Sequence, residues 1–301
     1  MKAVVLLNCG SGAIDSSKAD AETERVAAAF RAAGLEAPVH AVPASHIEEA
    51  ASAAALSEAD TVVFGGGDGT LSTGAAALVG GAKTLGILPL GTFNHFAKDL
   101  GIPLKLEDAV RTIAEGHLRE VDVGEANGRP FLNNSSIGLY PEMVGVRDDL
   151  RRHHGIRKGP AMLHAAREVL RDPPFLRVDL RVFDDVTRVR TPFVFVGNNR
   201  YEMKLFSLGA RSVLDRGELS LYVARNVRRW GIVRLALRAL VGRLRQDRDF
   251  EALTVPQVEV AMHRRIVRVA LDGEVFRMES PLCYRLRPRA LRVLAPKAPG
   301  A

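Results

Sequence analysis

One stretch of the sequence decides its fold class, Thr61-Val62-Val63-Phe64-Gly65-Gly66-Gly67-Asp68-Gly69-Thr70. The apolar run before the glycines is typical of a buried strand, and the small residues after Thr70 are typical of a helix. Glycines let backbone N–H groups approach an anion closely, and a helix N-terminus adds a favourable partial charge. The order strand, glycine turn, helix therefore predicts a phosphate site formed by Gly65, Gly66, Gly67, Asp68, Gly69 and Thr70.

Asp68 lies inside this turn and bears on the chemistry of the site. A carboxylate repels a phosphate unless a cation or a water lies between them, so Asp68 indicates Mg²⁺. The glycine spacing matches neither GxxxxGK[ST] nor GxGxxG, which excludes the usual P-loop and the usual dinucleotide motif. Glycines that only shape a tight turn between a strand and a helix are the alternative interpretation.

The composition is that of an ordinary globular protein with room for two domains, since 47% of the 301 residues are hydrophobic and 26% are charged. No run of about 18 uncharged apolar residues occurs, so we expect no membrane span. The opening residues are typical of a first strand, not of a signal peptide. Two cysteines, Cys9 and Cys283, make neither a disulfide framework nor a metal cluster, and we expect a cytoplasmic setting.

Charge is unevenly distributed along the chain. Residues 1–124 carry 9 Lys and Arg against 16 Asp and Glu, whereas residues 125–301 carry 33 against 19. Most of the later cations are arginines, which suit phosphates, carboxylates and anionic surfaces. Only 6% of residues are aromatic and no DNA- or RNA-binding motif occurs, so an anionic membrane surface is a better partner than nucleic acid.

Up to residue 116, strand-like runs alternate with helical ones. This alternation predicts a parallel, doubly wound α/β sheet, which binds its ligands at the carboxyl ends of the strands. Two further loops leave strands at that edge, one with Asn8, Gly10, Ser11 and Gly12, the other with Thr92 and Asn94. The predicted strands are residues 2–7, 37–42, 61–64 and 85–90. The predicted helices are 20–33, 44–57, a segment from about 71, a segment after the third loop that ends before Gly101, and 107–116.

The sequence pattern changes near residue 125, where helical segments become rare and short strand-like segments follow one another. Such strands with turn signals between them predict an antiparallel β-sandwich, and the change predicts a domain boundary. Two helices are expected in this part, one at residues 161–170 and an amphipathic one near residues 228–245. The expected strands are residues 130–137, 175–183, 191–196, 218–224, 256–262, 265–271 and 282–287.

Taken in order, these motifs resemble the diacylglycerol kinase catalytic-domain family, which includes bacterial lipid kinases and sphingosine and ceramide kinases and is related to NAD kinases. GGGDGT followed about twenty residues later by PLGTFN is specific as a combination. The resemblance covers nearly the whole chain. It rests on residues 8–12, 65–70, 88–94, 122, 133–138, 197–199 and 271–274.

The resemblance implies a nucleotide-binding α/β domain and a C-terminal antiparallel β-sandwich domain that holds the lipid substrate. The ATP-binding domain would comprise residues 1–125 with a returning tail, 288–301, and the sandwich residues 126–287. Residues 290–294 would pair back with the first domain.

The resemblance also implies ATP- and Mg²⁺-dependent transfer of the γ-phosphoryl group to a hydroxyl of diacylglycerol or a related lipid. Asp68 would lie near the Mg²⁺, Glu274 would be the base, and Asp272 belongs to the same catalytic motif. Asp-Gly is also the favoured pair of a plain hairpin turn, which is the alternative for this motif. ATP would meet Asn8, Gly10, Ser11, Gly12, Gly65, Gly66, Gly67, Asp68, Gly69, Thr70, Thr92 and Asn94.

The chain departs from the family pattern at three positions. Cys9 replaces a proline, His95 replaces an aspartate, and Arg216 stands where many bacterial members have the aspartate of a structural Mg²⁺ site, so no second metal is expected. Two alternatives stay open. One is a kinase for a soluble acceptor such as NAD, since NAD kinases resemble the chain at GGDGT, and the other is a non-catalytic lipid or nucleotide sensor, which His95 and Arg216 motivate. As a lipid kinase the protein would work in the cytoplasm, peripherally bound to the inner face of the membrane.

Overall fold

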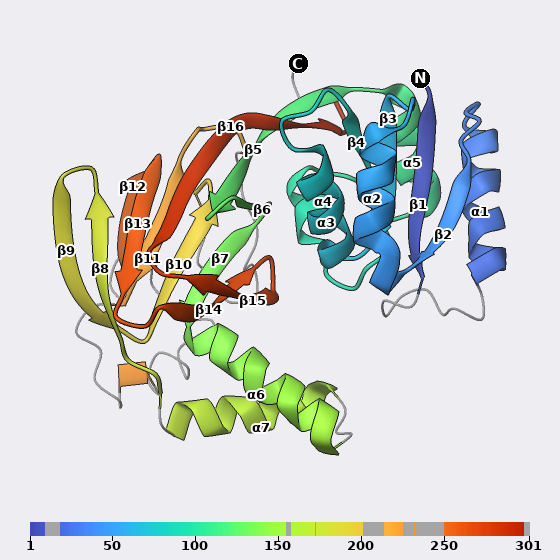
Figure 1. Cartoon of the computed structure of the whole chain (residues 1–301). Coiled ribbons are helices and arrows are strands. Elements are labelled where there is room, and N and C mark those ends of the chain that lie inside the picture. Colours follow the sequence, from blue (N-terminus) through green and yellow to red (C-terminus); the bar gives the residue numbers. More distant parts are fainter. Residues whose placement is uncertain are drawn as a thin grey trace. The chain divides into compact units, whose positions relative to one another are not determined.

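The computed structural model describes residues 1–9, 19–154, 158–171, 173–200, 214–224, 231–232 and 250–297. They divide into two compact units (Figure 1). Unit 1 comprises Met1–Val123, Ser212–Arg216 and Arg287–Ala301, and unit 2 comprises Gly124–Arg211 and Gly217–Leu286. The domain limits expected from the sequence stay a prediction.

Unit 1 is built on a parallel sheet in the order β2-β1-β3-β4, with the end of β16 beside β4. Arg292 and Val293 of β16 pair in parallel with Thr84 and Leu85, so the returning tail joins this sheet as expected. The buried Asp122 of β5 accepts a hydrogen bond from the Arg289 N–H at 2.8 Å. The strands are β1 (Ala3–Cys9), β2 (Val39–Pro43), β3 (Thr61–Gly66), β4 (Thr84–Pro89), β5 (Leu118–Ala126) and β16 (Leu282–Leu294).

Helices of unit 1 form two groups, because α1 contacts α5 and α2 contacts α3. In α5, Leu106, Ala109, Val110 and Ile113 are buried at the spacing of one helix face, and Gly116 follows the helix with a φ of 68°. The doubly wound α/β fold is confirmed. The helices are α1 (Ala19–Ala32), η2 (Ala44–His46), α2 (Ile47–Leu56), α3 (Asp68–Leu78), α4 (His95–Asp99) and α5 (Leu106–Glu115).

Unit 2 contains two antiparallel layers. One is a six-stranded sheet in the order β12-β11-β10-β7-β14-β15, and the other runs from the beginning of β16 through β13 and β8 to β9, with β6 paired to β5. The first layer consists of β12 (Glu251–Val255), β11 (Leu219–Val223), β10 (Phe193–Asn198), β7 (Asn134–Gly138), β14 (Ile266–Leu271) and β15 (Glu274–Glu279). The second adds β6 (Arg129–Phe131), β8 (Leu176–Val182), β9 (Asp185–Thr191) and β13 (Gln257–Met262).

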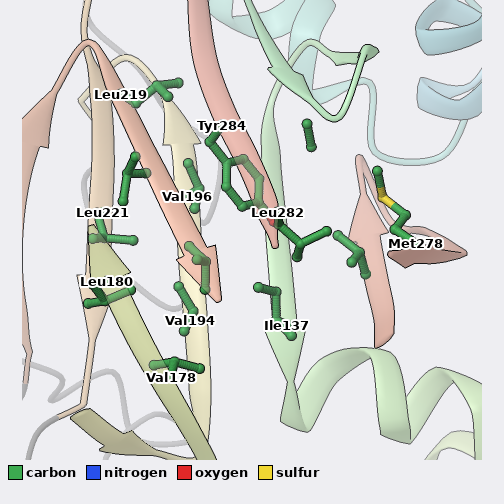
Figure 2. Packing of buried hydrophobic residues seen from close by; sticks show 14 of the residues in the cluster. Ile137, Val178, Leu180, Val194, Val196, Leu219, Leu221, Met278, Leu282 and Tyr284 are labelled. Carbon is green, nitrogen blue, oxygen red and sulfur yellow. The ribbon is translucent and has the colours of Figure 1, made fainter. Parts of the chain in front are cut away.

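The core of unit 2 lies between these layers, as Figure 2 shows. Val194 and Leu221 come from the six-stranded sheet and meet Leu180 and Tyr284 from the other layer, all at most 2% exposed. Each buried aliphatic side chain contributes about 1.5–3 kcal/mol relative to an exposed one. The Tyr284 hydroxyl lies 2.9 Å from the Ser135 hydroxyl, so its polar end is satisfied within the core. The antiparallel sandwich is confirmed.

Two helices of unit 2 pack against each other, α6 (Leu139–His154) and α7 (Lys158–Arg171), and α6 also contacts β7, β14 and β15 (Figure 1). The helix expected at residues 161–170 lies within α7, whereas α6 was not predicted. Nearly all of the helix expected near residues 228–245 lies outside the described residues. None of the helices in the described ranges is long and apolar enough to cross a membrane.

Candidate functional site

Three loops leave the carboxyl edge of the sheet in unit 1. The strands β1, β3 and β4 are parallel neighbours, and Leu7 pairs with Gly65 while Gly66 pairs with Pro89. Asn8, the Gly65–Thr70 loop and the loop after Pro89 therefore emerge side by side. Of the predicted site residues, Gly10, Ser11 and Gly12 lie outside the described residues.

Glycine is required where the second and third loops approach each other. A Cβ on Gly91 would overlap the Cα of Gly67, and a Cβ on Gly66 would lie 2.5 Å from the Thr70 Oγ1. Gly67 is the N-cap of α3, so the N–H groups of the first helical turn begin at this point. The two backbones thus form a cradle without side chains at a helix N-terminus, which suits a phosphate.

Asn8 adds a buried polar atom to this cradle. Its Nδ2 donates to the Thr70 Oγ1 at 2.7 Å, the residue is 5% exposed, and its Oδ1 has no hydrogen-bond partner among the described residues. If the amide turned over, Oδ1 would accept from the Thr70 hydroxyl and Nδ2 would be presented as a donor. A buried amide with one unused end is costly unless a ligand meets it, so Asn8 fits a phosphate oxygen.

Asp68 is the first residue of α3, where a carboxylate is favoured by the helix dipole. Its Oδ1 accepts from the Phe96 N–H of α4 at 3.4 Å. Within the described part of the chain, no three His, Cys, Asp or Glu side chains are grouped as metal ligands. A single carboxylate still fits Mg²⁺, which commonly takes one or two carboxylates together with phosphate oxygens and waters.

The third loop is shaped by Asn94, which has a left-handed backbone with a φ of 52° and is 4% exposed. Its Oδ1 accepts from the Gly91 N–H at 3.0 Å, and its Nδ2 donates to the carbonyls of Pro89 at 3.2 Å and Gly91 at 2.8 Å. Its amide is thus engaged with the loop's own backbone, whereas Thr92 is exposed at the surface of the loop. The contact of either residue with a nucleotide stays a prediction.

The Asp272–Glu274 motif of unit 2 forms the turn of the β14–β15 hairpin. Leu271 pairs with Glu274, and both residues between them have a positive φ, 48° at Asp272 and 90° at Gly273. This is the pattern that favours Asp-Gly in two-residue hairpin turns. The hairpin interpretation of the motif therefore holds, and Glu274 is the exposed first residue of β15.

The Asp272 carboxylate is bound to the backbone of the segment that joins β6 to β7. It accepts hydrogen bonds from the N–H groups of Leu132 at 2.7 Å, Asn133 at 2.7 Å and Asn134 at 3.1 Å. The Asp272 N–H donates in turn to the Asn134 carbonyl at 2.9 Å. Asp272 thus anchors the turn that carries Glu274, and a direct catalytic role for it stays a prediction.

Asn198 supports the same segment from β10 and was not among the predicted site residues. Its Nδ2 donates to the Leu132 carbonyl at 2.8 Å, and its N–H donates to the Asn133 carbonyl at 2.9 Å. The residue is 1% exposed. Its place in the Gly197–Asn199 motif was the available signal, but the sequence did not show what the amide binds.

Cys9 follows Asn8 at the end of β1, where the family pattern has proline. Burial raises the pKa of the Cys9 thiol, so it is neutral near pH 7. We therefore expect a packing role for this side chain.

The chain matches two family models. The model of the diacylglycerol kinase catalytic domain matches residues 2–126, and that of the YegS C-terminal NAD kinase beta sandwich-like domain matches residues 160–295. A probable lipid kinase YegS-like of Pseudomonas savastanoi pv. phaseolicola is 31% identical over 249 residues, which is 78% of this chain and 75% of that protein. This chain belongs to the diacylglycerol kinase family.

Other members of the diacylglycerol kinase family agree with this assignment. A diacylglycerol kinase of Bacillus subtilis is 29% identical over 258 residues, 81% of either chain. The crystal structure of a protein described as a diacylglycerol kinase from Bacillus anthracis has a TM-score of 0.76 at 23% identity, covering 99% of this chain and 98% of that one, which shows a common fold. The predicted resemblance and the class of enzyme, a lipid kinase, are thus confirmed at the level of the family.

Proposed function

We propose that the protein transfers the γ-phosphoryl group of ATP, with Mg²⁺, to a hydroxyl of diacylglycerol or a related lipid. The observation that carries the proposal is the cradle of unit 1, where Gly66 and Gly91 leave no room for a Cβ and the buried Asn8 keeps one amide atom unused. Such a cradle suits the oxygens of a polyphosphate. Family membership supplies the lipid as the class of acceptor.

The residues of unit 1 would bind and orient the nucleotide. The backbone N–H groups from Gly67 to Thr70 would face phosphate oxygens, with Asn8 as a side-chain donor. Asp68 would hold Mg²⁺, which when bound supplies neutralisation of the charge on the phosphates. Phosphoryl transfer needs mainly positioning and charge neutralisation, and this loop with its bound Mg²⁺ would supply both.

Glu274 of unit 2 would accept the proton of the lipid hydroxyl. It is exposed, and the turn before it is fixed by the three hydrogen bonds of Asp272. A positioned base of this kind contributes typically 10²- to 10⁴-fold to the rate. Asp272 would then act by holding Glu274 in place.

The test is an assay with labelled ATP on a total lipid extract, with Mg²⁺ or with EDTA, and identification of the product by mass. We expect a phosphorylated lipid as the product. EDTA should abolish its formation, and Asp68→Ala and Glu274→Gln should each reduce its yield strongly. NADP formed from NAD, with no labelled lipid, would favour a soluble acceptor. Absence of turnover with both would favour the sensor.

We also propose that the protein binds the cytoplasmic face of the membrane peripherally. The support is the excess of cations after residue 124, with 33 Lys and Arg against 19 Asp and Glu. Each well-placed cation contributes about 1 kcal/mol to binding of an anionic surface. Sedimentation with phosphatidylglycerol vesicles should be lost at high salt and absent with phosphatidylcholine, and retention at high salt would contradict the electrostatic mechanism.

A further inference from the structure

The side chain of Tyr140 reaches the turn that carries Glu274. Tyr140 is the second residue of α6, and its hydroxyl lies 3.6 Å from the position that a Cβ on Gly273 would occupy. The side chain is 41% exposed, so it is open to solvent and to a ligand. A phenol oxygen therefore stands beside the Asp272–Glu274 turn, within unit 2.

Two sets of contacts hold the first turn of α6 in this place. Gly138 has a φ of 93°, and a Cβ there would overlap the Pro192 carbonyl, which accepts the Leu139 N–H at 3.1 Å. On the other side, the Glu142 carboxylate pairs with Arg268 of β14 at 2.8 Å. Since β14 leads directly into the turn, the helix and the hairpin are fixed to each other.

The Tyr140 hydroxyl has no hydrogen-bond partner among the residues that the structure describes. Because the side chain is 41% exposed, water can meet this hydroxyl, and an acceptor atom of a ligand can take the place of that water. Burial raises the pKa of Tyr140. Of the two smaller effects, the charge of Arg147 lowers this pKa and the charge of Asp148 raises it. The group is thus a neutral phenol near pH 7 and can donate its proton in a hydrogen bond.

We propose that Tyr140 contacts the lipid substrate and donates a hydrogen bond to an oxygen next to the hydroxyl that reacts. An ester carbonyl is such an acceptor, whereas an ether oxygen at the same place is a poorer one. A hydrogen bond to Glu274 itself would stabilise its charged form and weaken it as a base, which is why we assign the bond to the lipid. This inference rests on the proposed function, because Glu274 marks the place of the acceptor.

The experiment compares two acceptors in mixed micelles, 1,2-dioctanoylglycerol and the matching dioctyl diether, with the wild type and Tyr140→Phe. We expect the wild type to prefer the diester by about 3- to 10-fold in kcat/KM, the size of one neutral hydrogen bond. Tyr140→Phe should erase this preference by raising the KM for the diester, with the KM for ATP and the Tm unchanged. Tyr284→Phe, which removes a hydroxyl from the core of the same unit, should keep the preference.

An equal loss on both acceptors would show that Tyr140 acts through Glu274 and would overturn the contact with the lipid, as would a preference that survives Tyr140→Phe. A wild type without preference would overturn it even if the variant did not fold. If the wild type phosphorylates neither glyceride and no lipid of a total extract, the proposed function itself fails, and the inference with it.

Discussion

The exchange Asp272→Asn tests whether this residue anchors the turn or takes part in the chemistry. Asparagine tolerates the φ of 48° as aspartate does, so the preference of the turn is retained. Only the charge and one acceptor atom are lost. The variant therefore isolates the hydrogen bonds of the carboxylate from the conformation of the turn.

The size of the effect follows from the three contacts. Oδ2 of Asp272 accepts from Leu132, and Oδ1 accepts from both Asn133 and Asn134. An amide in the better orientation keeps the two bonds to its oxygen, now without charge, and turns its NH₂ toward the Leu132 N–H. Losing one charge-assisted bond and weakening two others should cost about 2–4 kcal/mol, counting the donor left without an acceptor.

Hydrogen exchange of the backbone amides measures this cost locally. Protection of Leu132, Asn133 and Asn134 should fall by about 30- to 1000-fold, the equivalent of that free energy. Protection in β11, whose ladder does not involve Asp272, serves as the control and should change much less. Turnover should fall together with protection, because Glu274 is then less well held.

Full protection at residues 132–134 in Asp272→Asn would show that the carboxylate does not anchor this segment. If turnover were then lost, Asp272 would act on the substrate, as the motif alone suggests. If turnover were kept, the Asp272 carboxylate would be needed neither to anchor the backbone nor for turnover. Either result would show that the position of Glu274 does not depend on the three hydrogen bonds of Asp272.

Three further predictions concern the cradle, the core and the base. Gly91→Ala should lower the unfolding midpoint and raise the KM for ATP, because its Cβ overlaps Gly67, whereas Gly67→Ala, with only an ordinary contact at 3.5 Å, should keep the midpoint. Tyr284→Phe should lower the free energy of unfolding by about 1–2 kcal/mol in the wild type. It should lower it by less in the Ser135→Ala variant, where the hydrogen bond is already absent. Burial raises the pKa of Tyr284, so stability is lost as pH rises above about 10, where only the unfolded chain releases this proton, and Tyr284→Phe should flatten that slope in alkaline unfolding curves. Glu274→Gln should reduce kcat about 10²- to 10⁴-fold at an unchanged Tm, and near-normal turnover would exclude it as the base.

The parallel sheet was predictable because its signals are local. A run such as Thr61–Phe64 is apolar throughout, as a strand buried on both faces requires, and glycines follow at once. The order of such runs along the chain then fixes which loops share an edge. The sandwich was likewise predictable from its short strands and turn signals, whereas the return of β16 came only from the family resemblance.

The helix α6 shows why part of unit 2 was missed. Its sequence has Pro141 in the first turn and Gly145 inside, and glycine disfavours a helix interior. The fold tolerates Gly145 because the Arg268 guanidinium occupies the space beside it, with an Nη1 2.8 Å from the position of a Cβ. That partner lies far away in the sequence and exists only after folding.

The roles predicted for the site residues rest on residue type, which did not indicate the contacts that these residues make. Asp272 is separated from Leu132 by 140 residues, so nothing near Asp272 indicates that its carboxylate binds a backbone. Asn94 likewise looks like a ligand residue, yet its amide closes the loop that contains it. Tyr140 left no signal at all, because its position relative to Gly273 depends on the helix that was not predicted.

The hairpin turn at Asp272–Glu274 is compatible with the proposed role of Glu274 as a base, because the turn fixes the backbone that such a base needs. A general base must be held within a fraction of an ångström of its place, and a two-residue turn with two positive φ values fixes the backbone on both sides of it. The Leu271–Glu274 pair limits rotation of the turn, and the bonds of Asp272 limit its displacement from β7. A longer, more flexible turn would hold Glu274 less firmly, so the short Asp-Gly turn is compatible with the proposed catalytic role as well as with a plain hairpin.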